Sequence, residues 1–382
     1  MFSFLKRLFP LFVLILIISG LYLFLNKKIY IKDDIKLISF APLSGLNKDI
    51  SISFYKGVRA YFRYINEKRI LSKKIDFTLI DDKGKSDIAL SVLKNMDKNE
   101  PFAFFGVFSP CISKKILEIY SSKTHPFFMP YCSLKEFDTF KNYFSITKNI
   151  EEELEKLIEY LKENDIKRVS IFYENNYCFN EIKNKLEILL KKAHINWVDK
   201  ASYIADTFLI NDAYEKLAKK SPKAIFLLSF YRGASKFLQK AEDDYRFLDT
   251  IFLAPSCIGI EALRKEVEGM DLNLIVSTPI FPVDLNKNLK IEYENIMSIY
   301  YPKEKPNIDS FKGFLYAKIF ALALENSSSL LSFKDILNSL KSMPYIMYNR
   351  EFLVQFVGKD NKINKIYLLY LKDNKFIPLQ EE

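Results

Sequence analysis

The sequence predicts an α/β protein made of two doubly wound lobes of parallel sheet, joined by a hinge that the chain crosses more than once. Three observations lead to this prediction. From Ile35 onward, short apolar strands alternate with amphipathic helices, as they do where helices connect parallel strands. A second series of the same kind begins near residue 151, and from residue 276 helices precede two strands. The chain has 382 residues, which is enough for two cores of ordinary size.

The first series runs from residue 35 to residue 146 and holds four strand–helix units. Apolar residues of a helix recur at Phe54, Val58 and Phe62, and a second helix is marked by Ile88 and Val92. The strands are predicted at Ile35–Phe40, Ile75–Ile80, Phe102–Gly106, Phe127–Met129 and Tyr143–Ile146. Successive units of this kind predict a parallel sheet with helices on both faces.

Two loops of this first sheet are expected to form half of a ligand site. Ser109–Cys111 follows one buried strand and Tyr131–Ser133 follows the next. Neighbouring parallel strands place these loops side by side at the carboxyl edge of the sheet. In open α/β sheets ligands bind at that edge.

The second series and the tail complete the two lobes. The second series has strands predicted at Arg168–Tyr173, Trp197–Tyr203, Ala224–Leu228 and Thr250–Leu253. In the tail, helices are expected near 288–300, 308–325 and 333–341. Strands Phe352–Val357 and Lys365–Leu371 then follow, joined as a hairpin by a turn at 358–361. We expect lobe 1 to comprise 35–146 with about 277–345, and lobe 2 to comprise 147–276 with about 350–380.

The first 28 residues form a separate hydrophobic segment. Lys6 and Arg7 precede the apolar run Leu8–Leu25, and Asn26 and two lysines follow it. The run is long enough to span a bilayer, and no small-residue cleavage site follows it. An uncleaved membrane anchor is therefore favoured over a cleaved signal. In either case the body of the protein is expected in the periplasm or another extracytoplasmic space.

Composition argues against nucleic-acid binding and against catalysis. The net charge is +10, but the lysines are scattered over helix faces and mixed with glutamates. The two histidines, His125 and His194, have no carboxylate or nucleophile at a motif spacing, and no phosphate-binding or serine-hydrolase motif occurs. We predict a protein that is not an enzyme and that binds no cofactor, metal or nucleic acid.

Four cysteines follow predicted strands at the ligand edge. Cys111 and Cys132 belong to lobe 1, and Cys178 and Cys257 belong to lobe 2. Loops after neighbouring strands bring the two cysteines of one lobe within disulfide range. The alternatives are unpaired thiols packed in the loops, and thiols that meet a soft metal or the ligand across the closed cleft.

Short motifs follow one another in a characteristic order along residues 35–380. They are Ala41–Gly45 with Gly57, Asp81–Asp82, Gly106–Cys111, Pro126–Phe137, Lys167–Tyr177, Phe252–Gly259 and Ser277–Pro279. Their order and spacing resemble the type I periplasmic binding proteins, in particular their branched-chain amino-acid-binding branch. The resemblance implies two lobes that close over a small solute by hinge motion.

The resemblance also implies ligand contacts at individual residues. Ser133 matches a hydroxyl that holds the ligand's amino group, and Tyr177 and Tyr231 match aromatic contacts of the second lobe. Ser109 and Cys111 lie in a loop that receives a carboxylate, where the start of a helix offers free N–H groups.

Some positions depart from the pattern of an amino-acid binder. Pro110 has no N–H to donate where a carboxylate-binding serine is common, and Ser256 replaces the acid that pairs with the ligand's ammonium. Ile50 replaces an aromatic residue, and Arg232 adds a cation next to Tyr231. Arg232 favours an amide or carboxylate-like solute, unless it is a solvated charge at a helix start. Glu174 offers another acid for an ammonium.

These features predict an extracytoplasmic protein that captures a small amino-acid, amide or carboxylate-like solute for an ABC-type importer. Its expected partners are that solute, the permease subunits of the importer, and the membrane through residues 8–25. The alternative is a membrane-tethered ligand sensor or a cell-envelope regulatory module with the same fold. A third possibility is a protein of this fold that has lost its ligand and activates an enzyme by contact.

Overall fold

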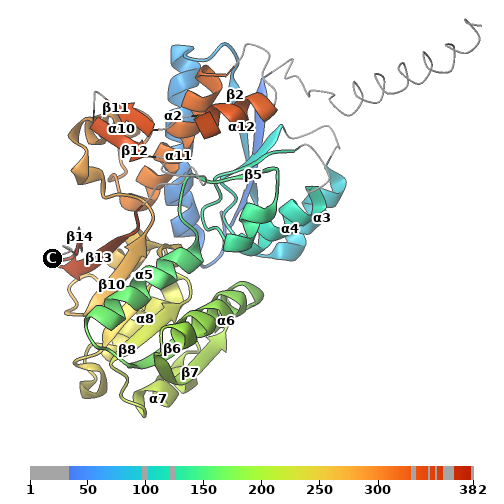
Figure 1. Ribbon diagram of the computed structural model, residues 1–382. Helices are drawn as coiled ribbons and strands as arrows, with labels where there is room; N and C mark the ends of the chain where they lie inside the picture. Colours follow the sequence, from blue (N-terminus) through green and yellow to red (C-terminus); the bar gives the residue numbers. More distant parts are fainter. Residues whose placement is uncertain are drawn as a thin grey trace, which may run out of the picture.

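The chain folds into two α/β lobes, each built on one sheet (Figure 1). The computed structural model describes residues 34–96, 102–120, 125–327, 333–342, 345–348, 351–355 and 365–379. Within these ranges no helix has both the length and the apolar character that crossing a membrane requires. The predicted anchor at residues 8–25 lies outside the described residues and stays a prediction.

Lobe 1 contains a five-stranded sheet in which all neighbouring strands are parallel. Across the sheet the strands are β2 (Ile75–Asp81), β1 (Ile35–Ala41), β3 (Ala103–Phe105), β4 (Phe127–Phe128) and β5 (Tyr143–Phe144). Its helices are α2 (Lys48–Lys68), α3 (Ser86–Asn95) and α4 (Pro110–Tyr120), with α10 (Lys287–Tyr300), α11 (Ile308–Glu325) and α12 (Phe333–Ser342) from the tail. The predicted parallel sheet is therefore confirmed, and the three tail helices lie where they were expected.

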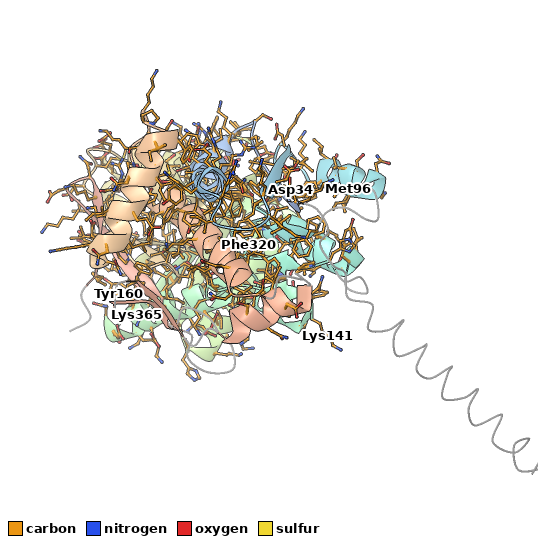
Figure 2. All side chains as sticks on the ribbon, turned by 90° about the horizontal axis from the view of Figure 1, so that it is seen from above. Asp34, Met96, Lys141, Tyr160, Phe320 and Lys365 are labelled. Atoms are coloured by element: carbon orange, nitrogen blue, oxygen red, sulfur yellow. A yellow bond between two sulfur atoms is a disulfide. The ribbon has the colours of Figure 1, made fainter. Side chains whose placement is uncertain are left out.

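Helix α11 forms the centre of lobe 1 and is buried over nearly its whole length. It packs against α2 at Gly57 and Gly313, where a Cβ atom would overlap with the backbone of the facing helix. Its Phe320 lies in the interior (Figure 2), with ring centroids 5.2 Å from Phe105 and 5.1 Å from Phe128. The two glycines let the helices approach closely, and α11 thereby brings its polar residues to the boundary between the lobes.

Lobe 2 contains a seven-stranded mixed sheet. Its parallel part consists of β7 (Asn196–Ile204), β6 (Arg168–Asn175), β8 (Ala224–Leu228), β9 (Ile251–Ala254) and β10 (Leu274–Thr278), in that spatial order. Its helices are α5 (Ile150–Glu163), α6 (Tyr177–Lys192), α7 (Asn211–Ala218), α8 (Tyr231–Ala241) and α9 (Ile260–Glu266). A capping box formed by Asn149 and Glu152 begins α5 directly after the chain leaves lobe 1.

The last four strands of the described chain pair differently from the prediction. β13 (Tyr367–Lys372) and β14 (Lys375–Pro378) form a hairpin, and β13 lies antiparallel to β10 (Figure 1). β12 (Glu351–Gln355) pairs instead with β11 (Tyr345–Tyr348). The predicted hairpin between 352–357 and 365–371 is therefore wrong, because β13 adds to the open edge of the lobe 2 sheet. The turn expected at 358–361 lies outside the described residues.

The chain passes between the two sheets after β5, after β10 and again before β13. This agrees with the multi-crossing hinge of the predicted fold. The residue limits that we assign to the two lobes stay a prediction.

Candidate functional site

A cavity of about 160 Å³ lies between the two lobes, at the carboxyl ends of the strands of both sheets. Lobe 1 contributes the loops after β1, β2, β3 and β4, and lobe 2 contributes those after β6, β7, β8 and β9. Its walls include Phe108, Ser109 and Tyr131 from lobe 1 and Glu174, Tyr177 and Phe230 from lobe 2. Loops far apart in the sequence thus meet around one cavity.

A row of four aromatic rings crosses from lobe 1 to lobe 2 beside this cavity. Tyr131 stacks on Phe108 with centroids 4.6 Å apart, and Phe108 stacks on Phe230 of the other lobe at 6.0 Å. Phe179 then meets Phe230 edge to face at 5.1 Å. Offset and edge-to-face pairs at these distances are favourable. This aromatic row holds the lobes in contact and forms an apolar wall of the cavity.

Both disulfides of the described chain join one lobe to the other. Cys111 pairs with Cys178, with Cα atoms 5.7 Å apart, and Cys132 pairs with Cys257 at 5.9 Å. The expectation of pairs within each lobe is wrong. Closure of the lobes brings the facing loop edges together, and each cysteine of lobe 1 then meets a cysteine of lobe 2.

Glu174 is a buried acid in the cavity wall, 4% exposed. Its carboxylate accepts hydrogen bonds from the Tyr203 hydroxyl at 2.8 Å and from Asn176 Nδ2 at 2.7 Å. No cation lies within salt-bridge distance of it among the described residues. Burial raises the pKa of Glu174, and the two hydrogen bonds act in the opposite direction. Such a group is suited to a donor or a cation supplied by a ligand.

Three of the predicted ligand residues line the cavity. Ser109 and Cys111 lie at the start of α4, and Tyr177 begins α6 at the rim, 58% exposed. The Ser109 hydroxyl oxygen is 3.7 Å from Cys178 Sγ. The β3–α4 and β6–α6 loops therefore face each other. Cys111 forms a disulfide with Cys178 and has no free thiol to offer a ligand.

The two other predicted serines are buried outside the cavity wall. Ser256 donates from both its backbone N–H and its hydroxyl to the carboxylate of Glu153, each at 2.8 Å. Ser133 accepts at its backbone carbonyl from the Ile150 N–H at 3.0 Å, where the chain enters lobe 2. Both serines thus take part in the internal structure near the hinge.

Tyr231 and Arg232 contact lobe 1 instead of the cavity. The Tyr231 hydroxyl donates to Asp49 Oδ2 at 2.7 Å, and Arg232 Nη2 lies 3.0 Å from the same oxygen. Arg232 also donates from Nε to the carbonyl of Leu46 at 2.7 Å and lies 3.6 Å from Glu266. Arg232 therefore joins the two lobes, and it is not among the residues that line the cavity.

A buried charge cluster at the lobe boundary was not predicted. It consists of Glu153 in α5 and of Asp309 and Lys312 in α11, each at most 5% exposed. Lys312 donates to the carbonyl of Tyr131 at 2.7 Å, and the Tyr131 hydroxyl donates to Asp309 at 3.0 Å. A signal was present in the sequence, because Asp309 and Lys312 are charged residues in a helix that is otherwise mostly apolar.

The pKa values in this cluster are shifted chiefly by burial. Burial raises the pKa of Asp309 to about 6 and lowers that of Lys312 to about 8. The pKa of Glu153 is also raised by burial, against the hydrogen bonds from Ser256 and the charge of Lys312. The two carboxylates and the ammonium thus stabilise one another across the boundary.

The comparisons with known proteins concern almost the whole described chain. The family described as periplasmic binding protein matches residues 34–374. No curated protein matches. Solved structures with the same fold share only 12–20% of their residues with this chain, so their likeness shows the fold alone.

A possible leucine/isoleucine/valine-binding protein from Rhodopirellula baltica SH 1 has a TM-score of 0.80 and 18% identity, covering 91% of this chain and 96% of that chain. A substrate-binding periplasmic protein from Ralstonia solanacearum has a TM-score of 0.77 and 20% identity, over 91% and 100%. A branched-chain amino acid ABC transporter protein from Thermus thermophilus, solved with bound valine, has a TM-score of 0.75 and 12% identity, over 91% and 96%.

Proposed function

The chain belongs to the periplasmic binding protein family, and from this premise we propose that it holds a small solute between its lobes and presents it to an ABC-type importer. The observation that carries the proposal is the cavity lined by the carboxyl ends of both sheets. Ligands of open α/β sheets bind at this edge. The same premise supports a place outside the cytoplasm and a role in binding instead of catalysis.

The size of the cavity limits the solute. Its volume of about 160 Å³ is small, since drug-sized ligands occupy pockets of roughly 300–1,000 Å³. A cavity of about 150 Å³ in another protein holds a benzene molecule, which has six non-hydrogen atoms. We therefore infer a solute of about that size.

The charges around the cavity indicate the chemistry of the solute. Glu174 is buried and accepts hydrogen bonds without a cation beside it among the described residues. Arg232, the cation that had favoured an anionic solute, is held by Asp49. Phe108 and Phe230 supply an apolar wall. This combination favours a small amino acid or amide, with its nitrogen donating to Glu174 and its apolar part against the rings.

A thermal-shift screen of the full chain tests this function. Small amino acids, amides, amines and carboxylates are screened against the protein as isolated and against the protein treated with a dithiol reductant. A solute present at 100 times its dissociation constant stabilises the folded state by about 2.7 kcal/mol. Stabilisation by an amino acid or amide is expected in at least one of the two states. If no class stabilises the protein in either state, the solute-binding proposal fails.

Replacement of Glu174 by glutamine tests the position of the solute. Loss of a hydrogen bond to a charged group is worth about 1.5–3 kcal/mol, so affinity for the solute is expected to fall about ten- to hundredfold. The matched control is Glu163→Gln, which changes an exposed carboxylate at the end of α5. Equal affinities for both variants would place the solute elsewhere.

A second candidate function is a regulatory module of the same fold. The two disulfides and the aromatic row favour this candidate, because they hold the two lobes together in a closed arrangement. This candidate predicts that no solute class stabilises the protein in either redox state although it remains folded by circular dichroism.

A further inference from the structure

The two disulfides hold the lobes together at two different places. Cys132–Cys257 lies near the hinge, because Ser133 next to Cys132 bonds to Ile150 at the first passage between the lobes. Cys111–Cys178 joins the starts of α4 and α6. We call them the inner and the outer bond. One bond would leave the lobes free to rotate about it, whereas two bonds together with the passages of the chain leave no hinge motion.

The two bonds differ in their access to solvent. Both sulfur-bearing residues of the inner bond are buried, at 4% exposure each. All four cysteines line the cavity, but in the outer bond Cys111 is 7% exposed and Cys178 is more exposed than the other three. We therefore expect a reductant in solution to reach Cys178 before it reaches the other three cysteines.

We infer that the two disulfides form a redox latch on the hinge. With both bonds intact the lobes stay closed, and a solute cannot enter or leave by hinge opening. A dithiol reductant breaks the outer bond first, the lobes then open by rotation about the inner bond near the hinge, and the inner bond is reduced second. This inference goes beyond the proposed function, because lobe opening is measurable without a solute.

The opening reaction is a thiol–disulfide exchange. A thiolate of the reductant attacks Cys178 Sγ, the bond between the two sulfurs breaks, and Cys111 leaves as a thiolate. Cys111 is the second residue of α4, where the helix dipole stabilises a thiolate. The second thiol of the reductant then attacks the mixed disulfide and releases Cys178. Two electrons and two protons pass to the protein, and the reductant becomes a disulfide.

The order of opening is tested by timed reduction of the full chain with dithiothreitol. Samples are quenched with iodoacetamide, and mass spectrometry follows alkylation at each cysteine. We expect no alkylation before reduction, and alkylation of Cys111 and Cys178 at least tenfold faster than that of Cys132 and Cys257. Free thiols in the untreated oxidised protein, equal rates or the reverse order would each overturn the inference.

Opening itself is tested by small-angle X-ray scattering without solute. The radius of gyration is expected to increase in the fully reduced protein and to stay unchanged in the oxidised protein. Replacement of all four cysteines by serine should give the same increase without reductant. If that variant does not fold, the reduced wild-type chain carries the test alone. An unchanged radius of gyration in folded reduced protein would show that the disulfides do not restrain the hinge.

Discussion

Replacement of Gly259 by alanine tests the contact that closes the lobes near the hinge. Gly259 lies between β9 and α9 of lobe 2 with a φ of +88°, and a Cβ atom there would overlap with Cδ1 and Cγ1 of Ile50 in lobe 1. The positive φ costs alanine about 1–2 kcal/mol. Overpacking of a well-filled site costs about 1–3 kcal/mol more. We therefore expect the free energy of unfolding to fall by about 2–5 kcal/mol.

Equilibrium unfolding in urea, followed by far-ultraviolet circular dichroism on the oxidised protein, measures this loss. Gly269→Ala is a matched control, because Gly269 has a φ of +86° and nothing lies within 4 Å of its added Cβ. The difference between the two variants isolates the overlap with Ile50. The overlap also disappears in the double variant Ile50→Ala with Gly259→Ala, which should lose about 1–3 kcal/mol less than the sum of the single losses. Simple additivity would refute the contact between the lobes.

Three further measurements test other buried features. Gly57→Ala places a Cβ atom on the carbonyl oxygen of Ser310 in α11. Because the helix backbone cannot move aside, we expect the free energy of unfolding in urea to fall by about 4 kcal/mol or more. A stability like that of the wild type would contradict the contact between α2 and α11. Burial raises the pKa of Asp82 to about 7. Its protonated carboxyl therefore contributes fully to stability below the unfolded pKa of about 4 and no longer does so once the pH has risen through 7, so the free energy of unfolding should rise by at most about 4 kcal/mol from pH 8 to pH 4. The same pH dependence of stability in Asp82→Asn would show that another group causes it. Lys312→Met leaves Glu153 buried without its cation and should cost about 3–5 kcal/mol, part of which the added change Glu153→Gln should restore; no restoration would show that the two charges are not coupled.

Much of the fold follows from local patterns in the sequence. The apolar run at residues 224–228 coincides with β8, and the apolar helix predicted at 308–325 coincides with α11. Such runs identify an element because burial on all sides requires it to be apolar. They do not identify its partner. β12 and β13 were both expected as strands, but their pairing depends on which sheet edge is open after the rest has folded.

The candidate site was predictable only in its general position. Ser109 and Tyr177 line the cavity because their loops follow strands whose carboxyl ends face each other. Ser256 and Arg232 lie elsewhere because Glu153 and Asp49, from distant segments, bind their polar groups. No local pattern reveals such partners, since they depend on how the lobes close.

The order of the cysteines along the chain has a consequence for how the protein is made. Cys111, Cys132, Cys178 and Cys257 pair first with third and second with fourth, across 67 and 125 residues. A chain that oxidises while it emerges residue by residue joins the first cysteine to the second, before the third is available. That early pair must be broken and exchanged before either lasting bond can form. For a chain oxidised in this way, formation of both bonds between the lobes depends on disulfide isomerisation as well as on oxidation.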